Sequence, residues 1–298
     1  MVARTAAIGE WTTADIPSLD GRHVIVTGAN SGIGYQAAMV LAAHGAQVTL
    51  ACRDVAKGNA AADAIRRNCA NAAVAVARLD LASLASVRSF ADTVLSQGQP
   101  LHCLINNAGV MAPPKRLETE DGFELQFGTN VLGHFALTAL LMPALERPAR
   151  ETSGHVTAPQ PSNRARVVIV ASIAHKRGRI DFDDLQSEKA YSAMGSYAQS
   201  KLADLMFAFE LDRRLRAAGS KVLSVAVHPG VASTNLFRTG DYSGMEKVVR
   251  DALGPVIGAV LNTDAAGALP TLYASIADTV VGADIMGRKA CLKRAASG

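Results

Sequence analysis

The sequence predicts an α/β protein in which a doubly wound parallel sheet lies between two layers of helices. Short apolar runs rich in β-branched residues alternate with longer amphipathic or alanine-rich segments, and this alternation is typical of β–α–β units. The apolar runs lack polar alternation, as expected of strands buried on both faces. A chain of 298 residues is long enough for one such domain. We therefore expect a three-layer αβα architecture in a single domain.

The predicted strands and helices alternate along the chain. The strands are expected at residues 23–28, 46–53, 73–80, 101–109, 166–172 and 222–230. The helices are expected near residues 32–44, 55–68, 83–97, 121–147 and 191–218. Residues 1–20 are interpreted as an N-terminal extension, which places the domain at residues 21–298. No clear closing strand follows the last predicted strand, so the structure of residues 274–298 is left open.

Two segments interrupt the alternation. Residues 146–166 contain three prolines and many polar side chains, which predict a surface loop before a core strand. Residues 234–254 follow the last predicted strand and are either a plain connection or a cover over a binding site. We place the substrate-covering segment at about residues 232–262.

Composition and charge restrict the class of protein. Hydrophobic residues make up 49% of the chain and charged residues 19%, as in globular proteins. The net charge of +4 and the lack of a dense basic run argue against a nucleic-acid partner. No signal peptide is evident, and no apolar run approaches the ~18 residues of a membrane span. Four cysteines without a CxxC pair, Cys52, Cys69, Cys103 and Cys291, favour reduced thiols, so we expect a soluble, cytoplasmic protein.

A glycine-rich turn after the first predicted strand is a candidate phosphate-binding site. The run VTGANSGIG places Gly28, Gly32 and Gly34 before the first helix, in the pattern GxxxGxG. Glycines let the backbone approach a pyrophosphate, and the start of a helix presents free N–H groups to it. The turn opens the first β–α–β unit, as a dinucleotide site requires. A tight turn that holds no ligand is the alternative.

A tyrosine and a lysine near the start of the last predicted helix are candidate acid–base residues. Tyr197 and Lys201 share one helical face because they are one turn apart. A nearby ammonium eases the ionisation of a phenol, which makes it a usable acid or base. On this pair alone, a half-buried tyrosine beside a surface lysine is the simpler interpretation. Apolar residues at helical spacing also predict a buried stripe, made of Leu202, Leu205, Met206 and Phe209.

Four motifs occur in the order and approximate spacing of one enzyme family. They are TGANSGIG, NNAG, YAQSK and HPGVAST. Through them the chain resembles the short-chain dehydrogenase/reductase family over about residues 21–273. ACRDVAKG and SIAHKRGRIDFDDL look like the branch that contains retinol dehydrogenases and protochlorophyllide reductases. The resemblance implies a Rossmann-type fold and hydride transfer between a nicotinamide cofactor and a carbonyl or alcohol.

The resemblance also implies which residues bind the cofactor. They are Gly28, Asn30, Ser31, Gly32, Ile33 and Gly34 in the turn, Arg53, Asp80, Leu81, Asn107, Ala108 and Gly109, Tyr197 and Lys201, and Pro229, Gly230, Val231 and Thr234. Asp80 and Leu81 are expected beside the adenine, although the pair would also suit a strand end that caps the next helix. The residues from 229 onward are expected to hold the carboxamide end of the nicotinamide.

The end of the second predicted strand bears on the choice of cofactor. An acid there hydrogen-bonds the ribose of NAD, whereas an arginine accommodates the extra phosphate of NADP. Arg53 precedes Asp54 here, and in the resembled branch that arginine accompanies NADP. An arginine can bind a phosphate through two parallel hydrogen bonds. We favour NADP(H); a surface Arg53 that pairs with Asp54 would leave NAD(H) possible.

The resemblance implies four catalytic residues, Asn130, Ser172, Tyr197 and Lys201. A free phenol titrates at about 10, and Lys201 together with the oxidised nicotinamide ring would favour the phenolate of Tyr197. Ser172 would orient the substrate oxygen. Asn130 would help hold a water that connects Lys201 to solvent. His175 and His228 are interpreted as structural or pocket-lining, and no metal site is expected.

These four residues discriminate between two functions. A non-catalytic sensor or scaffold that binds a dinucleotide has no need of all four, so we favour an oxidoreductase. Its partner would be a small carbonyl or alcohol compound, and a homo-oligomer is left open. Apolar residues that follow Ser172 and Thr234 indicate a lipophilic substrate unless they pack the core; they are Ile173, Ile180, Phe182, Leu236, Phe237, Met245 and Val248.

Overall fold

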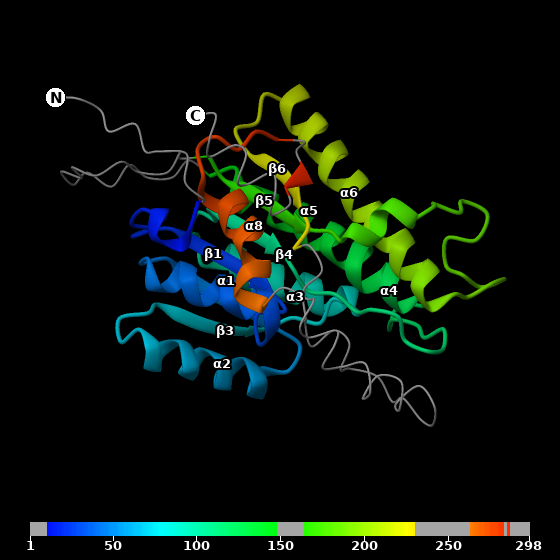
Figure 1. The fold of residues 1–298 in the computed structure, drawn as a ribbon, viewed down its shortest axis with the longest axis horizontal. Coiled ribbons are helices and arrows are strands. Elements are labelled where there is room, and N and C mark those ends of the chain that lie inside the picture. The colour runs from blue at the N-terminus through cyan, green and yellow to red at the C-terminus, as the bar shows by residue number, and fades with distance from the viewer. Residues whose placement is uncertain (1–10, 148–163, 230–262, 283–284, 287–298) are drawn as a thin grey trace.

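Seven parallel strands form one sheet in a computed structural model that describes residues 11–147, 164–229, 263–282 and 285–286. The strand order is β3-β2-β1-β4-β5-β6-β7. The strands are β1 (His23–Thr27), β2 (Gln47–Cys52), β3 (Val74–Arg78), β4 (Cys103–Asn106), β5 (Arg166–Val170), β6 (Leu223–Val227) and β7 (Ile285–Met286). The predicted doubly wound sheet in a single α/β domain is therefore confirmed (Figure 1).

Helices cover both faces of this sheet. They are α1 (Gly32–Ala43), α2 (Val55–Asn68), α3 (Leu84–Ser96), α4 (Leu125–Phe127), α5 (Gly133–Leu145), α6 (Ala193–Ala217) and α8 (Asp264–Ile276). One core cluster joins α1, α2 and α8 to one face of the sheet, and a second cluster joins α3, α5 and α6 to the other. Short turns complete the list, η1 (Thr13–Asp15), the π-helical η2 (Gly128–Leu132) and η3 (Ile173–Arg177). The predicted three-layer αβα architecture is confirmed.

The strand order reverses direction at β1, in the middle of the sheet. The chain runs outward from β1 to β2 and β3, then crosses back to place β4 on the other side of β1. Open α/β sheets bind ligands at such a reversal, beyond the carboxyl ends of the strands. The glycine turn follows β1, Asn107 follows β4 and Ser172 lies two residues beyond β5. The topology thus brings distant candidate residues to one edge.

Two elements near the C-terminus were not predicted. β7 pairs with β6 through Ile285 and Met286, in the part of the chain whose structure the sequence left open. A strand of two residues is too short to leave a pattern in the sequence. α8 packs against α1 with Leu272 and Tyr273 buried. Gly267 and the internal Pro270 weaken its helical signal.

The part of the predicted N-terminal extension that is described packs on the domain. Ile16 and Leu19 are buried in the core, and the Leu19 N–H donates to the His44 carbonyl at 2.7 Å. Trp11 meets the ring of Tyr273 edge-on, with centroids 5.2 Å apart. The domain boundary stays a prediction. Residues 148–163 of the predicted loop and the whole of the predicted covering segment (232–262) lie outside the described residues.

The stretch from Leu125 to Leu145 is long and apolar enough to cross a membrane by length and composition. Within an apolar window of 18 residues in this stretch, 56% is buried inside the protein. Leu137 and Leu141 are fully buried in the core cluster that includes α3. Core packing therefore accounts for the apolar character of this stretch.

α6 buries polar residues and exposes apolar ones. Leu205 is buried, but Met206 and Phe209 are 49% and 37% exposed, so the predicted apolar stripe is wrong for these two. The buried face instead follows positions at helical spacing, Tyr197, Lys201, Asp204, Ala208, Asp212 and Leu215. Buried polar side chains that override the local pattern are expected at functional sites.

Candidate active site

The glycine turn between β1 and α1 has the form of an anion site. Gly28 has φ +65°, and a Cβ there would lie 2.9 Å from the Cα of Ala108. Gly32 has φ +60° with open space beside it. Ser31 is the N-cap of α1, yet its side chain makes no capping hydrogen bond. The start of α1 therefore keeps backbone donors and a hydroxyl for a ligand such as a pyrophosphate.

Arg53 lies exposed directly after β2. Asp54 does not pair with it; the Asp54 carboxylate caps α2 by accepting from the Lys57 N–H at 3.0 Å and lies 3.5 Å from the Lys57 ammonium. The alternative in which Arg53 pairs with Asp54 is thus not realised. Across the described ranges Arg53 makes neither an ion pair nor a hydrogen bond, so its guanidinium is available to an anion.

Asp80 and Leu81, which were expected beside the adenine, make local contacts within the protein. The Asp80 carboxylate accepts from the Ala82 N–H at 3.0 Å, and Ser83 caps α3. The Leu81 side chain is buried in the core. These side chains therefore fit the alternative in which the pair ends a strand ahead of the next helix. Their contact with an adenine stays a prediction.

Thr27 at the end of β1 organises the neighbouring NNAG turn. Its hydroxyl oxygen accepts from the N–H groups of Asn107 and Ala108, both at 2.9 Å. The Asn107 amide donates to the Thr27 carbonyl at 2.8 Å. The glycine turn and the NNAG turn, both at the carboxyl edge of the sheet, are therefore joined through one buried threonine.

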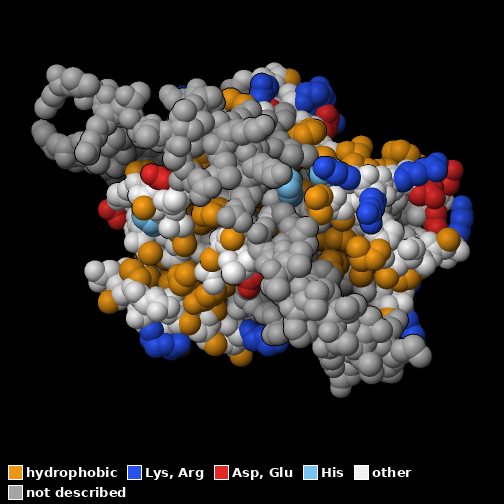
Figure 2. Space-filling view, in the orientation of Figure 1, with side chains coloured by type: hydrophobic (Ala, Val, Ile, Leu, Met, Phe, Trp, Pro, Cys, Tyr) orange, Lys and Arg blue, Asp and Glu red, His pale blue; other side chains and the backbone are white. Residues whose placement is uncertain are grey.

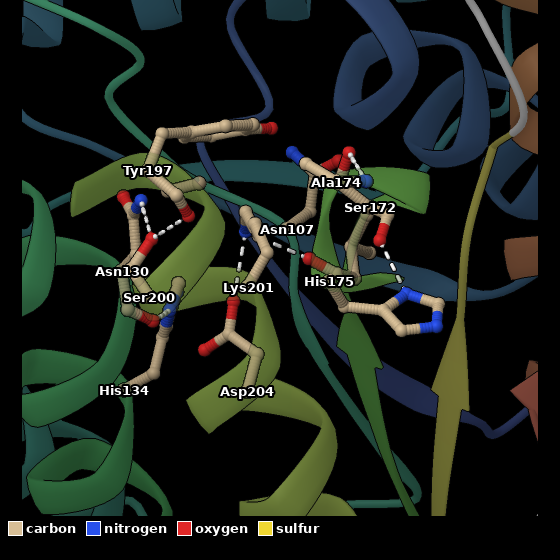
Figure 3. Close-up of polar contacts among 12 residues, drawn as sticks. Asn107, Asn130, His134, Ser172, Ala174, His175, Tyr197, Ser200, Lys201 and Asp204 are labelled. Atoms are coloured by element: carbon tan, nitrogen blue, oxygen red, sulfur yellow. Dashed lines mark hydrogen bonds and ion pairs between the residues drawn. The ribbon is translucent and has the colours of Figure 1, made fainter. Parts of the chain in front are cut away.

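Tyr197 and Lys201 lie on the buried face of α6, with Tyr197 above Lys201 and Asp204 below it in Figure 3. The Lys201 ammonium donates to the Val170 carbonyl at 2.9 Å and to the Asp204 carboxylate at 2.8 Å. Burial alone would lower the pKa of Lys201, but Asp204 and Tyr197 outweigh burial and raise it. The lysine is therefore a fixed positive charge beside Tyr197.

Asn130 sits in the π-helical turn with its side chain fully used. Its Oδ1 accepts from the Val110 N–H at 2.8 Å, and its Nδ2 donates to the Val110 carbonyl and the Ser200 hydroxyl, both at 3.0 Å. Ser200 in turn donates to the Tyr197 carbonyl at 2.8 Å. Asn130 thus ties the segment after the NNAG turn to α6. Its expected role with a water stays a prediction.

His134, one turn after Asn130, is a buried residue that the sequence analysis missed. Its Nδ1 lies 2.8 Å from the Asn130 carbonyl and its Nε2 lies 2.9 Å from the Thr27 hydroxyl. Burial lowers the pKa of His134 to about 4, so the ring is neutral at pH 7. Because a carbonyl only accepts, Nδ1 carries the proton and Nε2 accepts from Thr27.

Ser172 lies just beyond β5, on the side of the site opposite α6 (Figure 3). Its hydroxyl oxygen caps η3 by accepting from the Ala174 N–H at 3.2 Å. The hydroxyl hydrogen remains for a substrate oxygen. The His175 Nδ1 lies 2.6 Å from the Ser172 carbonyl, which fits the structural interpretation of His175.

The remaining predicted residues are only partly described. Pro229 follows β6, whereas Gly230, Val231 and Thr234 lie outside the described residues. Among the expected pocket residues, Ile173 and Phe182 are 42% and 79% exposed, so neither packs the core. Leu236, Phe237, Met245 and Val248 are not described. No group of three His, Cys, Asp or Glu in the described part of the chain could hold a metal.

The sequence as a whole matches a known family profile, described as short chain dehydrogenase, over residues 22–241. The chain belongs to the short-chain dehydrogenase family. It is 43% identical over 272 residues to retinol dehydrogenase 13 of Homo sapiens, covering 91% of this chain and 76% of that protein. It is 49% identical over 220 residues to human retinol dehydrogenase 12, covering 74% and 64%. The resemblance and branch predicted from the sequence are confirmed.

Three further comparisons concern one more sequence relative and two solved structures. Polyprenol dehydrogenase of Mus musculus is 42% identical over 274 residues, covering 92% of this chain and 77% of that protein. An uncharacterized protein from Mycobacterium paratuberculosis has a solved structure with TM-score 0.71 and 42% identity, covering 94% and 85%. A short chain dehydrogenase from Escherichia coli complexed with NADPH has TM-score 0.66 at 19% identity, covering 94% and 100%. The chain spans about two thirds to three quarters of the named relatives' length.

Asp204 is the second residue that the sequence analysis missed. It follows Lys201 by three residues, so helical spacing placed an acid on the same face. His134 likewise follows Asn130 by four residues. Both signals were present in the sequence, but each looked like one of many polar residues on an amphipathic helix.

Proposed function

We propose that this oxidoreductase uses NADP(H) to interconvert a lipophilic alcohol and its carbonyl compound, with Tyr197 as the general acid or base. The arrangement that carries the proposal is Tyr197 and Lys201 on α6, facing Ser172 beyond β5 at the edge that holds the glycine turn. This is the carboxyl edge where α/β sheets bind ligands. We also propose a cytoplasmic location.

The residues of the glycine turn and Arg53 would hold the cofactor, which supplies or accepts a hydride when bound. The start of α1, with Ser31 and Gly32, suits the pyrophosphate. Arg53, unpaired in the described ranges, suits the extra phosphate of NADP(H). Asp54 is occupied by Lys57, which makes it a poorer partner for the ribose of NAD(H).

In the direction of reduction, this chain's own residues handle the proton. The Ser172 hydroxyl donates to the substrate carbonyl oxygen, because its own oxygen is oriented by the Ala174 N–H. Tyr197 gives its proton to that oxygen as the alcohol forms. The buried Lys201 ammonium stabilises the phenolate that remains. In oxidation the same proton returns to Tyr197.

The substrate class rests on similarity and on exposed apolar side chains. The named relatives are dehydrogenases of retinol and of polyprenol, which are both long lipophilic alcohols. Ile173 and Phe182 present apolar surface in the segment after Ser172. A non-catalytic sensor or scaffold that binds a dinucleotide is the alternative.

The test is a panel of lipophilic and small polar aldehydes, ketones and alcohols, followed by the absorbance of NADPH or NADH. We expect turnover with lipophilic compounds and a preference for NADPH. Tight NADPH binding without turnover of any compound would instead support the sensor.

A further inference from the structure

The carboxylate of Asp204 has no part in the mechanism above, although it touches the active-site lysine. Its Oδ2 lies 2.8 Å from the Lys201 ammonium, and the two side chains are only 3% and 6% exposed. Its Oδ1 is buried and has no hydrogen-bond partner among the residues the structure describes. A buried acid that is only half satisfied is costly and calls for a reason.

Asp212 on the same helix shows what a structural acid looks like here. It is equally buried, but its two oxygens face the Arg216 guanidinium at 2.6 Å and the Ser224 N–H at 3.5 Å. Arg216 also donates to the Gly282 carbonyl, so Asp212 helps tie α6 to the next segment. Asp204 makes no comparable link between elements in the described structure.

Among the residues that the structure describes, few charged or titratable groups face Lys201. Tyr197 and Asp204 face it from α6, His134 faces it from α5, and β5 contributes the Val170 carbonyl. Burial lowers the pKa of His134 to about 4, so this ring is uncharged at pH 7. The positive charge that Tyr197 experiences is therefore set by Lys201 and Asp204 together.

We propose that Asp204 is a positioning residue that fixes the Lys201 ammonium and cancels part of its charge, so that Tyr197 keeps its proton at neutral pH. This inference rests on the proposed role of Tyr197. An ammonium has three donors, and Val170 and Asp204 engage two of them. One N–H is thus held in a defined direction for the site.

The protonation state of Asp204 sets the pH range over which its charge can offset that of Lys201. Burial raises the pKa of Asp204 to about 6, although Lys201 opposes the rise. The carboxylate is therefore charged at pH 7 and cancels the ammonium there. In mildly acidic solution it gains a proton, and the cancellation fades.

The first test is the pH dependence of kcat/KM, in both directions, for Asp204→Asn and the parent. Asp204 lies two helical turns from Tyr197, about 10 Å, where a unit charge in an effective dielectric of ~20 shifts an ionisation by about one pH unit. We expect both the oxidation and the reduction midpoints to fall by about that amount.

Two further variants separate charge from structure. Asp204→Glu keeps the charge and should keep the parent's midpoints. Asp212→Asn removes an equally buried acid from the same helix and should lower the thermal midpoint without moving the pH profile. Unchanged midpoints in Asp204→Asn would overturn the inference while leaving the proposed function intact, whereas a parent without turnover would overturn the proposed function first.

A second measurement needs no substitution at position 204. The near-ultraviolet phenolate absorbance of the parent minus that of Tyr197→Phe, without cofactor, isolates Tyr197. We expect no phenolate signal from Tyr197 at about pH 8, two units below the ~10 of a free phenol. A clear signal there would show that Lys201 acts with its full charge, and the inference would fail even if Asp204→Asn does not fold.

Discussion

The Nε2 atom of His134 lies 2.9 Å from the hydroxyl oxygen of Thr27, and the other ring nitrogen lies 2.8 Å from the carbonyl of Asn130. One buried ring therefore connects the end of β1, where the glycine turn begins, to the turn that carries Asn130. Thr27 also fixes the NNAG turn through two N–H groups. The cofactor edge and the proposed catalytic residues are thus built as one hydrogen-bonded unit.

This network makes stability depend on pH. Burial holds the pKa of His134 at about 4, below the ~6.5 of an unfolded histidine. Between these values the unfolded chain binds a proton that the folded chain does not, so stability is lost as the pH falls. From pH 7 to pH 5 the parent should lose about 2 kcal/mol through this residue.

Urea unfolding at both pH values checks this effect. The loss between pH 7 and pH 5 should be smaller in His134→Gln than in the parent, even though the variant is less stable overall. His44→Gln, at a partly exposed site, should retain the parent's loss. An identical loss in His134→Gln would show that His134 is not the titrating group.

Ser31 separates cofactor binding from helix capping. Its side chain makes no capping bond, so Ser31→Ala should change the unfolding free energy by less than ~0.5 kcal/mol while weakening NADPH binding several-fold. Ser83, which does cap α3, provides the control, because Ser83→Ala should cost about 1 kcal/mol and leave affinity unchanged. Calorimetric titration measures the affinity for NADPH and urea unfolding measures the stability, so together they distinguish cofactor binding from helix capping. A destabilised Ser31→Ala with parental affinity would contradict this role.

Arg53→Ala should weaken NADPH binding by about tenfold or more, because a charge-assisted phosphate contact contributes about 1.5–3 kcal/mol. NADH affinity should change little. Arg67→Ala removes another exposed arginine, at the other end of α2 from Arg53, and should affect neither cofactor. Equal losses for both cofactors in Arg53→Ala, or equal affinity of the parent for both, would show that Arg53 does not read the phosphate.

The layered fold was predictable because its signals are local and repeated. β-Branched runs such as the one that forms β5 are buried on both faces, and the helices between them are long enough to show their period. β7 was missed because two residues carry no pattern. α8 was missed because Gly267 and Pro270 interrupt its helical pattern.

Hydrophobic periodicity misled the analysis on α6. Met206 and Phe209 suggested a buried stripe, but the buried face carries Lys201 and Asp204. A functional helix can bury charges that the rest of the site compensates, and no local rule anticipates this. The motifs located the proposed catalytic residues, whereas His134 and Asp204 became visible only through their contacts. On the described part of the face in Figure 2, basic side chains stand in separate groups with acidic ones beside several of them.

The central claim is that the Tyr197 hydroxyl transfers the proton, and Tyr197→Phe tests it most directly. The substitution removes only that hydroxyl, so NADP(H) affinity measured by titration should stay close to the parent's. Turnover of the best substrate in the panel should fall by 10²-fold or more, since acid–base groups contribute about 10²–10⁴. Turnover within about tenfold of the parent, with cofactor binding intact, would contradict the account.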